Sequence, residues 1–189
     1  MITPELSRQL NALILLGISG LLAFAFLDQF LLDDLPCPLC LLQRVGFVLA
    51  GFGFALNVVI GPRPSHYGVA ILGAAVGAGV ATRQVLLHIV PGSGSYGDPL
   101  FGLHFYTWSL IAFCLIIVAS ALLLLFEDQF RPTPGMIKRE GWRGATGLGL
   151  VALFFFTLLT LVNAGSTFVE CELGLCPDNP ESYELLDEG

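Results

Sequence analysis

Apolar residues along the chain gather into five long runs, separated by short stretches rich in turn-forming and charged residues. A helix that crosses a bilayer needs roughly 20 predominantly apolar residues, and each run is close to that length. The runs are too long and too evenly apolar for the alternating strands of a membrane barrel. The pattern therefore predicts an all-α membrane protein with spans at about Leu10–Leu27, Leu41–Ile60, Gly68–Val90, Thr107–Phe126 and Ala145–Phe168.

The spans divide into a four-helix transmembrane bundle and an additional fifth transmembrane helix. We expect a membrane domain over residues 1–126, a cytoplasmic linker over 127–144, the fifth helix over 145–168 and an acidic periplasmic tail over 169–189. Small residues recur at four-residue spacing in the third span, as at Gly73 and Gly77. Because small residues let helix backbones approach closely in lipid, we expect tight packing there.

The amino-acid composition excludes several classes of protein. Hydrophobic residues make up 55% of the 189 residues and charged residues 12%, and the mean hydropathy is +0.80. A chain with so few charged residues cannot form a charged, water-exposed surface. This composition excludes a soluble enzyme, a disordered chain and a small secreted disulfide scaffold. The net charge of −7 argues against nucleic-acid binding, which needs a basic surface.

The basic residues predict the orientation, because they favour the cytoplasmic side of a membrane. Six of the eight lysines and arginines lie in segments that belong to one side: Arg8, Arg63, Arg131, Lys138, Arg139 and Arg143. The other two lie inside spans. We therefore expect the N-terminus in the cytoplasm and, after five crossings, the C-terminal tail outside.

The first cysteine pair, Cys37-Pro38-Leu39-Cys40, lies at the outer mouth of the second span. Such a spacing allows a small disulfide ring and lowers the pKa of a thiol, and a helix N-terminus favours a thiolate further. On the outer side of the membrane a disulfide can persist. The pattern favours a redox-active pair, with a static disulfide as the alternative.

Two arginines and a histidine are predicted near this pair. Arg44 is four residues after Cys40 and shares its helix face. A guanidinium inside the membrane is costly unless it is paired or functional, although its side chain can also extend to the interface. Arg83 and His88 approach the same outer layer from the third span, where His88 is either a ligand contact or a simple interfacial residue.

The second pair, Cys171 and Cys176, directly follows the fifth span, and Gly174 between them allows a tight turn. Five spans put this pair on the same side as Cys37 and Cys40. It is either a second redox pair or a structural disulfide of the tail. The remaining Cys114 is alone inside the fourth span, where we expect it to pack as a small apolar residue.

With these residues in view, the sequence resembles the disulfide-bond formation protein B (DsbB) family, bacterial membrane oxidases of thiols. The resemblance covers roughly residues 13 to 126. It is carried by Pro36-Cys37-Pro38-Leu39-Cys40-Leu41-Leu42-Gln43-Arg44, Arg83-Gln84-Val85, Phe101-Gly102-Leu103 and Trp108-Ser109-Leu110. The first of these motifs is the most specific.

The resemblance implies a quinone-dependent reaction in the bacterial inner membrane. Electrons would enter from a periplasmic thioredoxin-fold dithiol carrier (DsbA-like) and leave to ubiquinone or menaquinone. Cys37 and Cys40 would form the quinone-proximal redox disulfide, with Cys40 as the thiolate that faces the quinone. Arg44 would polarise the quinone carbonyl and stabilise the thiolate, and Arg83 and His88 would line or flank the quinone site.

The chain departs from the family pattern in two places. Family members normally carry a second redox pair between spans three and four, but here the segment Pro91–Tyr106 contains no cysteine. The family also usually stops at four spans. We hypothesise that Cys171 and Cys176 supply the second pair from the tail.

Three other classes remain open. A quinone reductase resembling the vitamin K epoxide reductase family would also set a C-x-x-C beside a quinone, but it does not explain the motif order or Arg44. Four outer cysteines could instead bind a metal such as zinc, which oxidising conditions and nearby arginines oppose. The third alternative is a purely structural membrane protein.

Overall fold

The computed structural model describes residues 2–31, 35–90, 92, 94, 99–131, 145–172, 174, 176, 183 and 185. These residues form five long helices, one short 3-10 helix and no strand beyond a single bridge between Leu100 and Leu103. The elements are α1 (Pro4–Leu31), α2 (Pro38–Val59), α3 (Pro64–Leu87), α4 (Phe105–Leu124), η1 (Glu127–Phe130) and α5 (Gly147–Cys171). All five long helices are long and apolar enough to cross a membrane, which confirms the all-α membrane fold.

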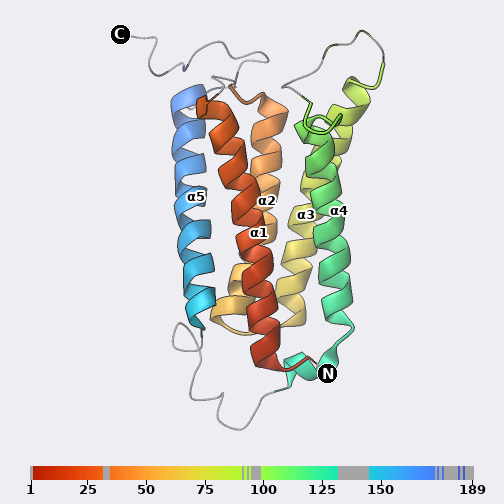
Figure 1. The fold of residues 1–189 in the computed structure, drawn as a ribbon, viewed down its shortest axis with the longest axis vertical. Helices are drawn as coiled ribbons and strands as arrows, with labels where there is room; N and C mark the ends of the chain where they lie inside the picture. Colours follow the sequence, from red (N-terminus) through yellow and green to blue (C-terminus); the bar gives the residue numbers. More distant parts are fainter. Residues whose placement is uncertain are drawn as a thin grey trace.

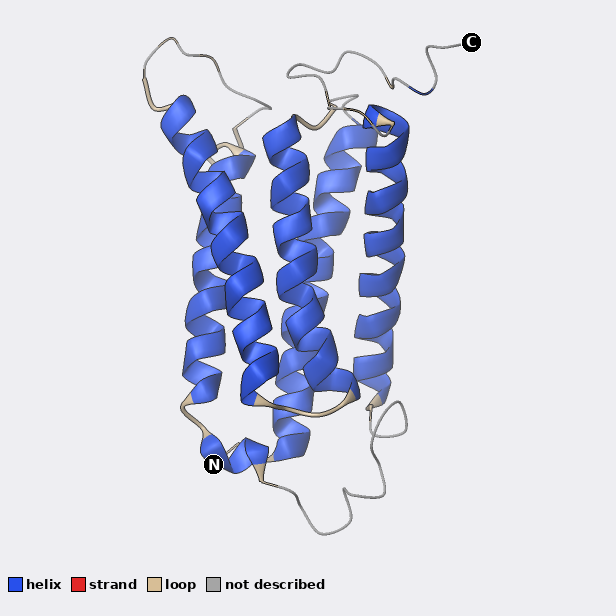
Figure 2. Ribbon diagram, turned by 180° about the vertical axis from the view of Figure 1, so that it is seen from behind, coloured by secondary structure: helices blue, strands red, loops and turns tan. Residues whose placement is uncertain are grey.

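The helices run up and down side by side (Figures 1 and 2). The closest neighbours are α2 with α3 and α3 with α4, whereas α5 packs mainly on α1 and to a smaller extent on α2. The α1–α4 pair is not among the closely packed ones. Because successive helices alternate in direction, the beginning of α2 and the end of α5 lie at the same end of the bundle (Figure 1).

Helix ends follow local chemistry and differ from the expected spans. The largest difference is in α1, which covers Pro4–Leu31 rather than Leu10–Leu27. Pro38 and Pro64 begin α2 and α3. Backbone N–H groups in the first turn have no partner within the helix, so the N–H that proline lacks removes no helical hydrogen bond. The third helix ends at Leu87 rather than Val90, and α5 continues from Phe168 to Cys171. The predicted linker 127–144 lies outside the described residues from 132 onward, as does most of the predicted tail.

The α2–α3 contact confirms the close approach expected from small residues. A Cβ atom at Gly73 would lie 2.5 Å from the backbone nitrogen of Ala50, and one at Gly46 would lie 2.7 Å from the Cα atom of Gly77. Neither neighbour is a flexible side chain that can move away. The two helix backbones can therefore touch only where glycine stands.

A buried polar cluster ties the helices together at the end opposite Cys37. The Asn11 amide donates to the Tyr67 hydroxyl at 2.8 Å, and the Asn57 amide donates to Asn11 Oδ1 at 2.9 Å. Ser7 and Tyr67 each donate to Gln129 Oε1, at 2.7 and 2.9 Å. Because each of these buried groups finds a partner, the cluster fixes α1, α2, α3 and η1 in one arrangement.

We predict that Gly73→Ala lowers the stability of the bundle by about 1–3 kcal/mol, because the added methyl group forces α2 and α3 apart. Thermal unfolding in detergent measures the effect. Gly79→Ala on the same helix is the control, since a Cβ there meets nothing within 4 Å. Equal melting temperatures for the two variants would contradict the tight contact.

Candidate active site

Cys37 and Cys40 are positioned by the first turn of α2. Cys37 is the N-cap residue, and its Sγ accepts the backbone N–H of Cys40 at 3.2 Å. Both residues are thiols in this structure; Cys37 is buried and Cys40 half-buried. Contact with the Cys40 sulfur, followed by burial, raises the pKa of the Cys37 thiol. Cys37 therefore keeps its proton more strongly than an ordinary cysteine does.

Gln84 of α3 faces both sulfur atoms. Its Nε2 donates to Cys37 Sγ at 3.3 Å and to Cys40 Sγ at 3.6 Å, and its side chain is fully buried. Its Oε1 accepts from Nε2 of Gln43, which fixes the amide with its donor toward the sulfurs. A donor held in this way stabilises a thiolate more than a thiol.

Arg44 is buried one turn below Cys40. Its Nη1 donates to Gln29 Oε1 at 2.8 Å and its Nη2 donates to the Ala25 carbonyl at 3.0 Å, while its guanidinium carbon lies 5.1 Å from the centre of the Phe26 ring. The side chain is therefore held inside the bundle by α1 and does not extend to the interface.

The fifth helix and the tail take part in holding this arginine. Nε2 of Gln29 donates to Ser166 Oγ at 3.1 Å and to the Tyr183 hydroxyl at 3.0 Å. The oxygen of the same Gln29 amide accepts from Arg44. Gln29 thus links the position of Arg44 to the position of α5.

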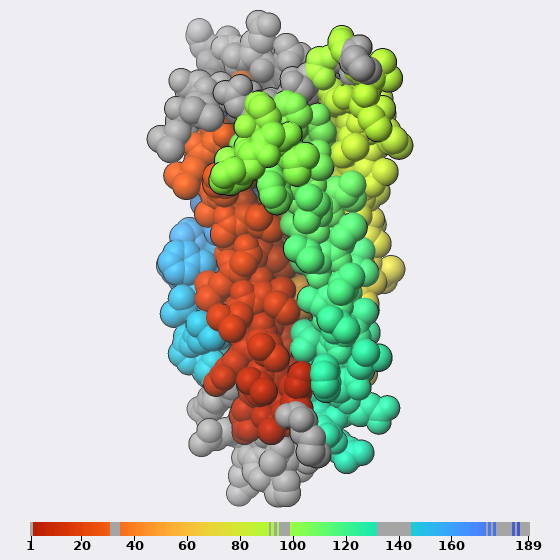
Figure 3. All heavy atoms as spheres, turned by 45° about the vertical axis from the view of Figure 1, so that its right-hand side comes forward, coloured from red at the N-terminus to blue at the C-terminus, as the bar shows by residue number. Residues whose placement is uncertain are grey.

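A cavity of about 770 Å³ lies beside these groups, between α1 and α4. Its polar end is formed by Asp28, Cys37, Cys40, Gln43 and Arg44. The rest of its wall is mostly apolar and includes Leu22, Phe24, Phe47, Phe105, Tyr106 and Trp108. On the face shown in Figure 3, α1 and α4 lie side by side, and the segment around the Leu100–Leu103 bridge lies over the upper part of their boundary.

Arg83 and His88 lie at the same end of the bundle but do not line this cavity. Arg83 is exposed on the surface of α3. His88 caps α3, shares a hydrogen bond of 2.9 Å with the Gln84 carbonyl, and stacks at 5.4 Å on Tyr106, which does line the cavity. Gln84, the neighbour of Arg83, contacts the two sulfurs, and it does not line the cavity either. A role of Arg83 or His88 in quinone binding stays a prediction.

Cys171 and Cys176 form a disulfide that closes the end of α5. Cys171 is buried, whereas Cys176 is half-buried and is the more accessible sulfur. The prediction that Cys114 packs inside the bundle is wrong, because it is exposed on α4. A single cysteine in an apolar run does not reveal which face of its helix it occupies.

Sequence reasoning missed three buried polar residues of this region, Gln29, Gln84 and Glu170. Each lies within a membrane helix and is at most 2% exposed. Polar side chains inside an apolar run were the available signal, since they are costly in lipid. Glu170 was counted instead as the start of the acidic tail, because α5 was expected to end at Phe168.

The fold and the site define a polytopic helical membrane protein with a dithiol and a buried arginine at one end of a cavity. A family model described as disulfide bond formation protein DsbB matches residues 7–95. A disulfide bond formation protein B of Burkholderia thailandensis is 32% identical over 163 residues, covering 66% of this chain and 94% of that protein. The chain belongs to the DsbB family.

Other relatives match a shorter part. Disulfide bond formation protein B of Hahella chejuensis is 42% identical over 89 residues, and that of a Xanthomonas campestris strain 41% over 92 residues. Each match covers 45% of this chain and 54% of the relative, so the chain spans about half the length of these proteins. No solved structure matches the chain.

We predict that Gln84→Leu slows alkylation of the Cys37/Cys40 pair at neutral pH by about tenfold, because the thiolate loses a hydrogen bond worth about 1.5–3 kcal/mol. Alkylation rates measured by mass spectrometry on the reduced protein test this. Thr82→Val, an exposed change on the same helix, is the control. An unchanged rate in Gln84→Leu would show that the amide does not act on the sulfurs.

Proposed function

We propose that this chain is a membrane thiol oxidase that supports disulfide-bond formation. It takes electrons from a periplasmic thioredoxin-fold dithiol carrier and passes them through Cys37 and Cys40 to a membrane quinone. The observation that carries the proposal is the shared cavity, which brings two thiols and a buried guanidinium to one end of an apolar space. Membership of the DsbB family supports the same reaction.

The cavity fits a quinone by size and chemistry. Its volume of about 770 Å³ lies within the range typical of small-molecule sites. Its apolar wall between α1 and α4 suits a lipid-soluble ring and tail, and Arg44 offers a hydrogen-bond donor at the polar end. Ubiquinone and menaquinone both meet these requirements. When bound, the quinone supplies the two-electron acceptor.

The residues of the chain have separate tasks in this reaction. The dithiol carrier first reduces the Cys171–Cys176 disulfide. The resulting thiols then reduce the Cys37–Cys40 disulfide by thiol exchange, which breaks its S–S bond, delivers two electrons and re-forms the Cys171–Cys176 bond. Cys40 then bears the negative charge, because Arg44 and the Gln84 amide stabilise it there. Cys37 keeps a proton. Loss of two electrons to the acceptor re-forms the S–S bond, and the fixed charge of Arg44 stabilises negative charge on the acceptor side.

The Cys171–Cys176 disulfide is proposed as the entry point for the carrier. It lies at the same end of the bundle as Cys37 (Figure 1), and Cys176 and Cys40 are half-buried while Cys37 is buried. The distribution of basic residues supports an outward orientation of this end, with the N-terminus in the cytoplasm. Family membership and the five apolar helices support a place in the bacterial inner membrane. The domain limits 1–126 and 145–168 separate the family-like bundle from the helix that carries this pair.

The alternatives have less support. In the part of the chain that the structure describes, no three His, Cys, Asp or Glu side chains group closely enough to hold a metal. Family membership favours DsbB over a protein resembling vitamin K epoxide reductase. A purely structural protein does not explain why Arg44 is buried beside two thiols.

We predict that Cys40→Ser abolishes reduction of a soluble ubiquinone analogue by a dithiol donor, and that Arg44→Ala lowers the rate by about a hundredfold. The reasons are the loss of the electron-carrying sulfur and of the positive charge. Quinol formation by the purified protein is measured from ultraviolet absorbance. Arg63→Ala, an exposed change at the opposite end, is the control. Wild-type activity in Cys40→Ser would reject the proposed electron path.

We predict that the double variant Cys171→Ser, Cys176→Ser oxidises a reduced DsbA-like protein at least about tenfold more slowly, since the carrier must then react directly with the Cys37–Cys40 disulfide, of which Cys37 is buried. Oxidation of dithiothreitol, a small dithiol, stays near the wild-type rate. The two donors are compared at equal quinone concentration. If both donors are oxidised as in the wild type, the tail disulfide is structural and lies outside the electron path.

A further inference from the structure

Glu170 lies in the last turn of α5, directly before the disulfide-bonded Cys171. Its side chain is fully buried, and neither carboxyl oxygen has a hydrogen-bond partner. An unpaired carboxylate away from water is costly, and acidic residues within membrane helices commonly mark proton or ion pathways. No task in the oxidase reaction described above uses this group.

The surroundings of Glu170 connect it to the dithiol site. Arg44 attracts its carboxylate, and Cys40 repels it when both are negatively charged. Asp28 of α1 and Tyr183 of the tail are the other titratable groups that interact with Arg44. Glu170 therefore shares the field of one buried cation with the sulfur that carries the negative charge in the proposed reaction.

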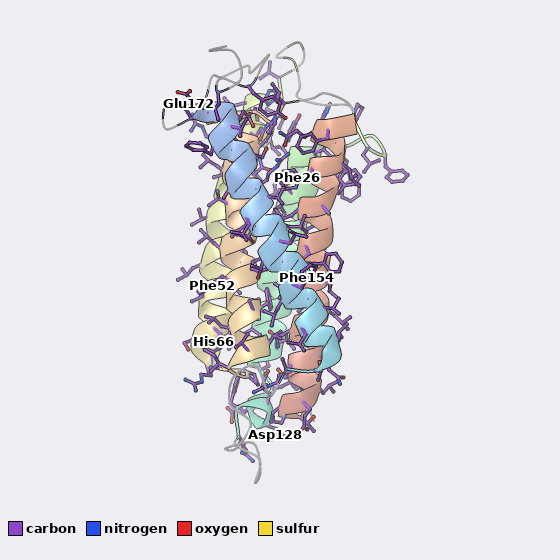
Figure 4. All side chains as sticks on the ribbon, turned by 90° about the vertical axis from the view of Figure 1, so that its left-hand side faces the viewer. Phe26, Phe52, His66, Asp128, Phe154 and Glu172 are labelled. Atoms are coloured by element: carbon purple, nitrogen blue, oxygen red, sulfur yellow. A yellow bond between two sulfur atoms is a disulfide. The ribbon has the colours of Figure 1, made fainter. Side chains whose placement is uncertain are left out.

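The fifth helix holds Glu170 in this position. Ser166, one turn earlier on α5, accepts a hydrogen bond from Gln29, whose oxygen accepts from Arg44. Figure 4 shows α5 crossing in front of its neighbours, with Glu172 at the end of the bundle where Phe26 lies and His66 at the other end. Phe26 contacts Arg44, so the arginine and the end of α5 lie toward the same end of the bundle.

One buried cation can neutralise one anion at a time. In a low-dielectric interior a second negative charge beside the first is strongly disfavoured, so one of the two groups takes up a proton. When Cys37 and Cys40 form a disulfide, Cys40 is uncharged, and the Glu170 carboxylate, together with Asp28, supplies the negative charge that acts on Arg44. When the pair is reduced, the Cys40 thiolate neutralises Arg44 instead.

We propose that Glu170 takes up a proton when the Cys37–Cys40 disulfide is reduced and releases it when the disulfide re-forms. The proposal deepens the oxidase function, on which it rests, by assigning a proton-carrying role to the helix that the family usually lacks. Glu170 does not line the cavity. It acts through Arg44, by balancing the positive charge of the guanidinium, and is a positioning residue rather than a catalytic one.

Electrons and protons balance in this scheme. Reduction breaks one S–S bond and takes up two electrons and two protons, one of which stays on Cys37 and the other on Glu170. Oxidation by the membrane quinone re-forms the S–S bond and passes both electrons to the acceptor, and both protons follow. The summed charge of Arg44, Cys40 and Glu170 is zero in both states, so no net charge is created inside the membrane.

The test is the pH dependence of the Cys37–Cys40 reduction potential around neutral pH, measured on the full chain in detergent without quinone. Alkylation and mass spectrometry of the Cys37/Cys40 peptide separate this pair from Cys171–Cys176. The expected slope is that of two protons per two electrons in the wild type and of one proton per two electrons in Glu170→Gln. A two-proton slope in Glu170→Gln overturns the proposal.

Glu172→Gln is the matched control, because this nearby carboxyl is partly exposed and outside α5; we expect it to keep the two-proton slope. If Glu170→Gln does not fold, infrared difference spectra of the wild type decide the question. A protonated carboxyl band must appear on reduction and disappear on oxidation, and its absence overturns the proposal.

Failure of this inference is distinguishable from failure of the oxidase function. The reduction potential is measured without quinone or carrier. A slope in Glu170→Gln equal to that of the wild type therefore rejects the proton role of Glu170. The oxidase function still stands in that case if the wild-type protein reduces quinone. Conversely, a wild type that does not reduce quinone but shows the expected slopes loses the oxidase assignment and keeps the proton coupling.

Discussion

The burial of one guanidinium is the constraint on which this end of the bundle depends. Arg44 lies inside a membrane helix, where an unpartnered charge is strongly disfavoured. Hydrogen bonds from Arg44 to Gln29 and to the Ala25 carbonyl fix α1 against α2, and Gln29 in turn reaches Ser166 of α5. Satisfying this charge therefore sets the positions of three helices. The same charge is then available to a thiolate one turn away.

The spacing of the helices leaves a cavity beside that charge. Tight glycine contacts join α2 to α3, while the boundary between α1 and α4 is left with a cavity. At the opposite end, the Asn11–Tyr67–Gln129 cluster holds the bundle closed. The helices are thus tied together at one end, and the cavity begins beside the cysteines and extends along α1 and α4 as far as Ile14 and Ala119. In the proposed reaction, this cavity is the space that would hold the membrane-soluble acceptor beside the sulfurs.

Much of the fold could be predicted from the sequence because transmembrane helices obey strong local rules. Length and apolarity located five spans, and the C-x-x-C with an arginine one turn later located the candidate site. The sequence did not show in the same way which side chains of α3 face the cysteines. Arg83 and Gln84 are adjacent in the sequence, yet only Gln84 faces the sulfurs, since the helix rotation is set by glycine packing against α2.

The sequence alone determined the membrane class, the helix number and the family-like Cys37–Arg44 segment, because each depends on composition or on residues within one or two turns. Tertiary structure alone decided that Gln29 and Gln84 complete the polar site and that a cavity opens between α1 and α4. It also put Glu170 inside the bundle rather than in the tail. These features join residues of different helices, and long-range packing rather than local pattern brings such residues together.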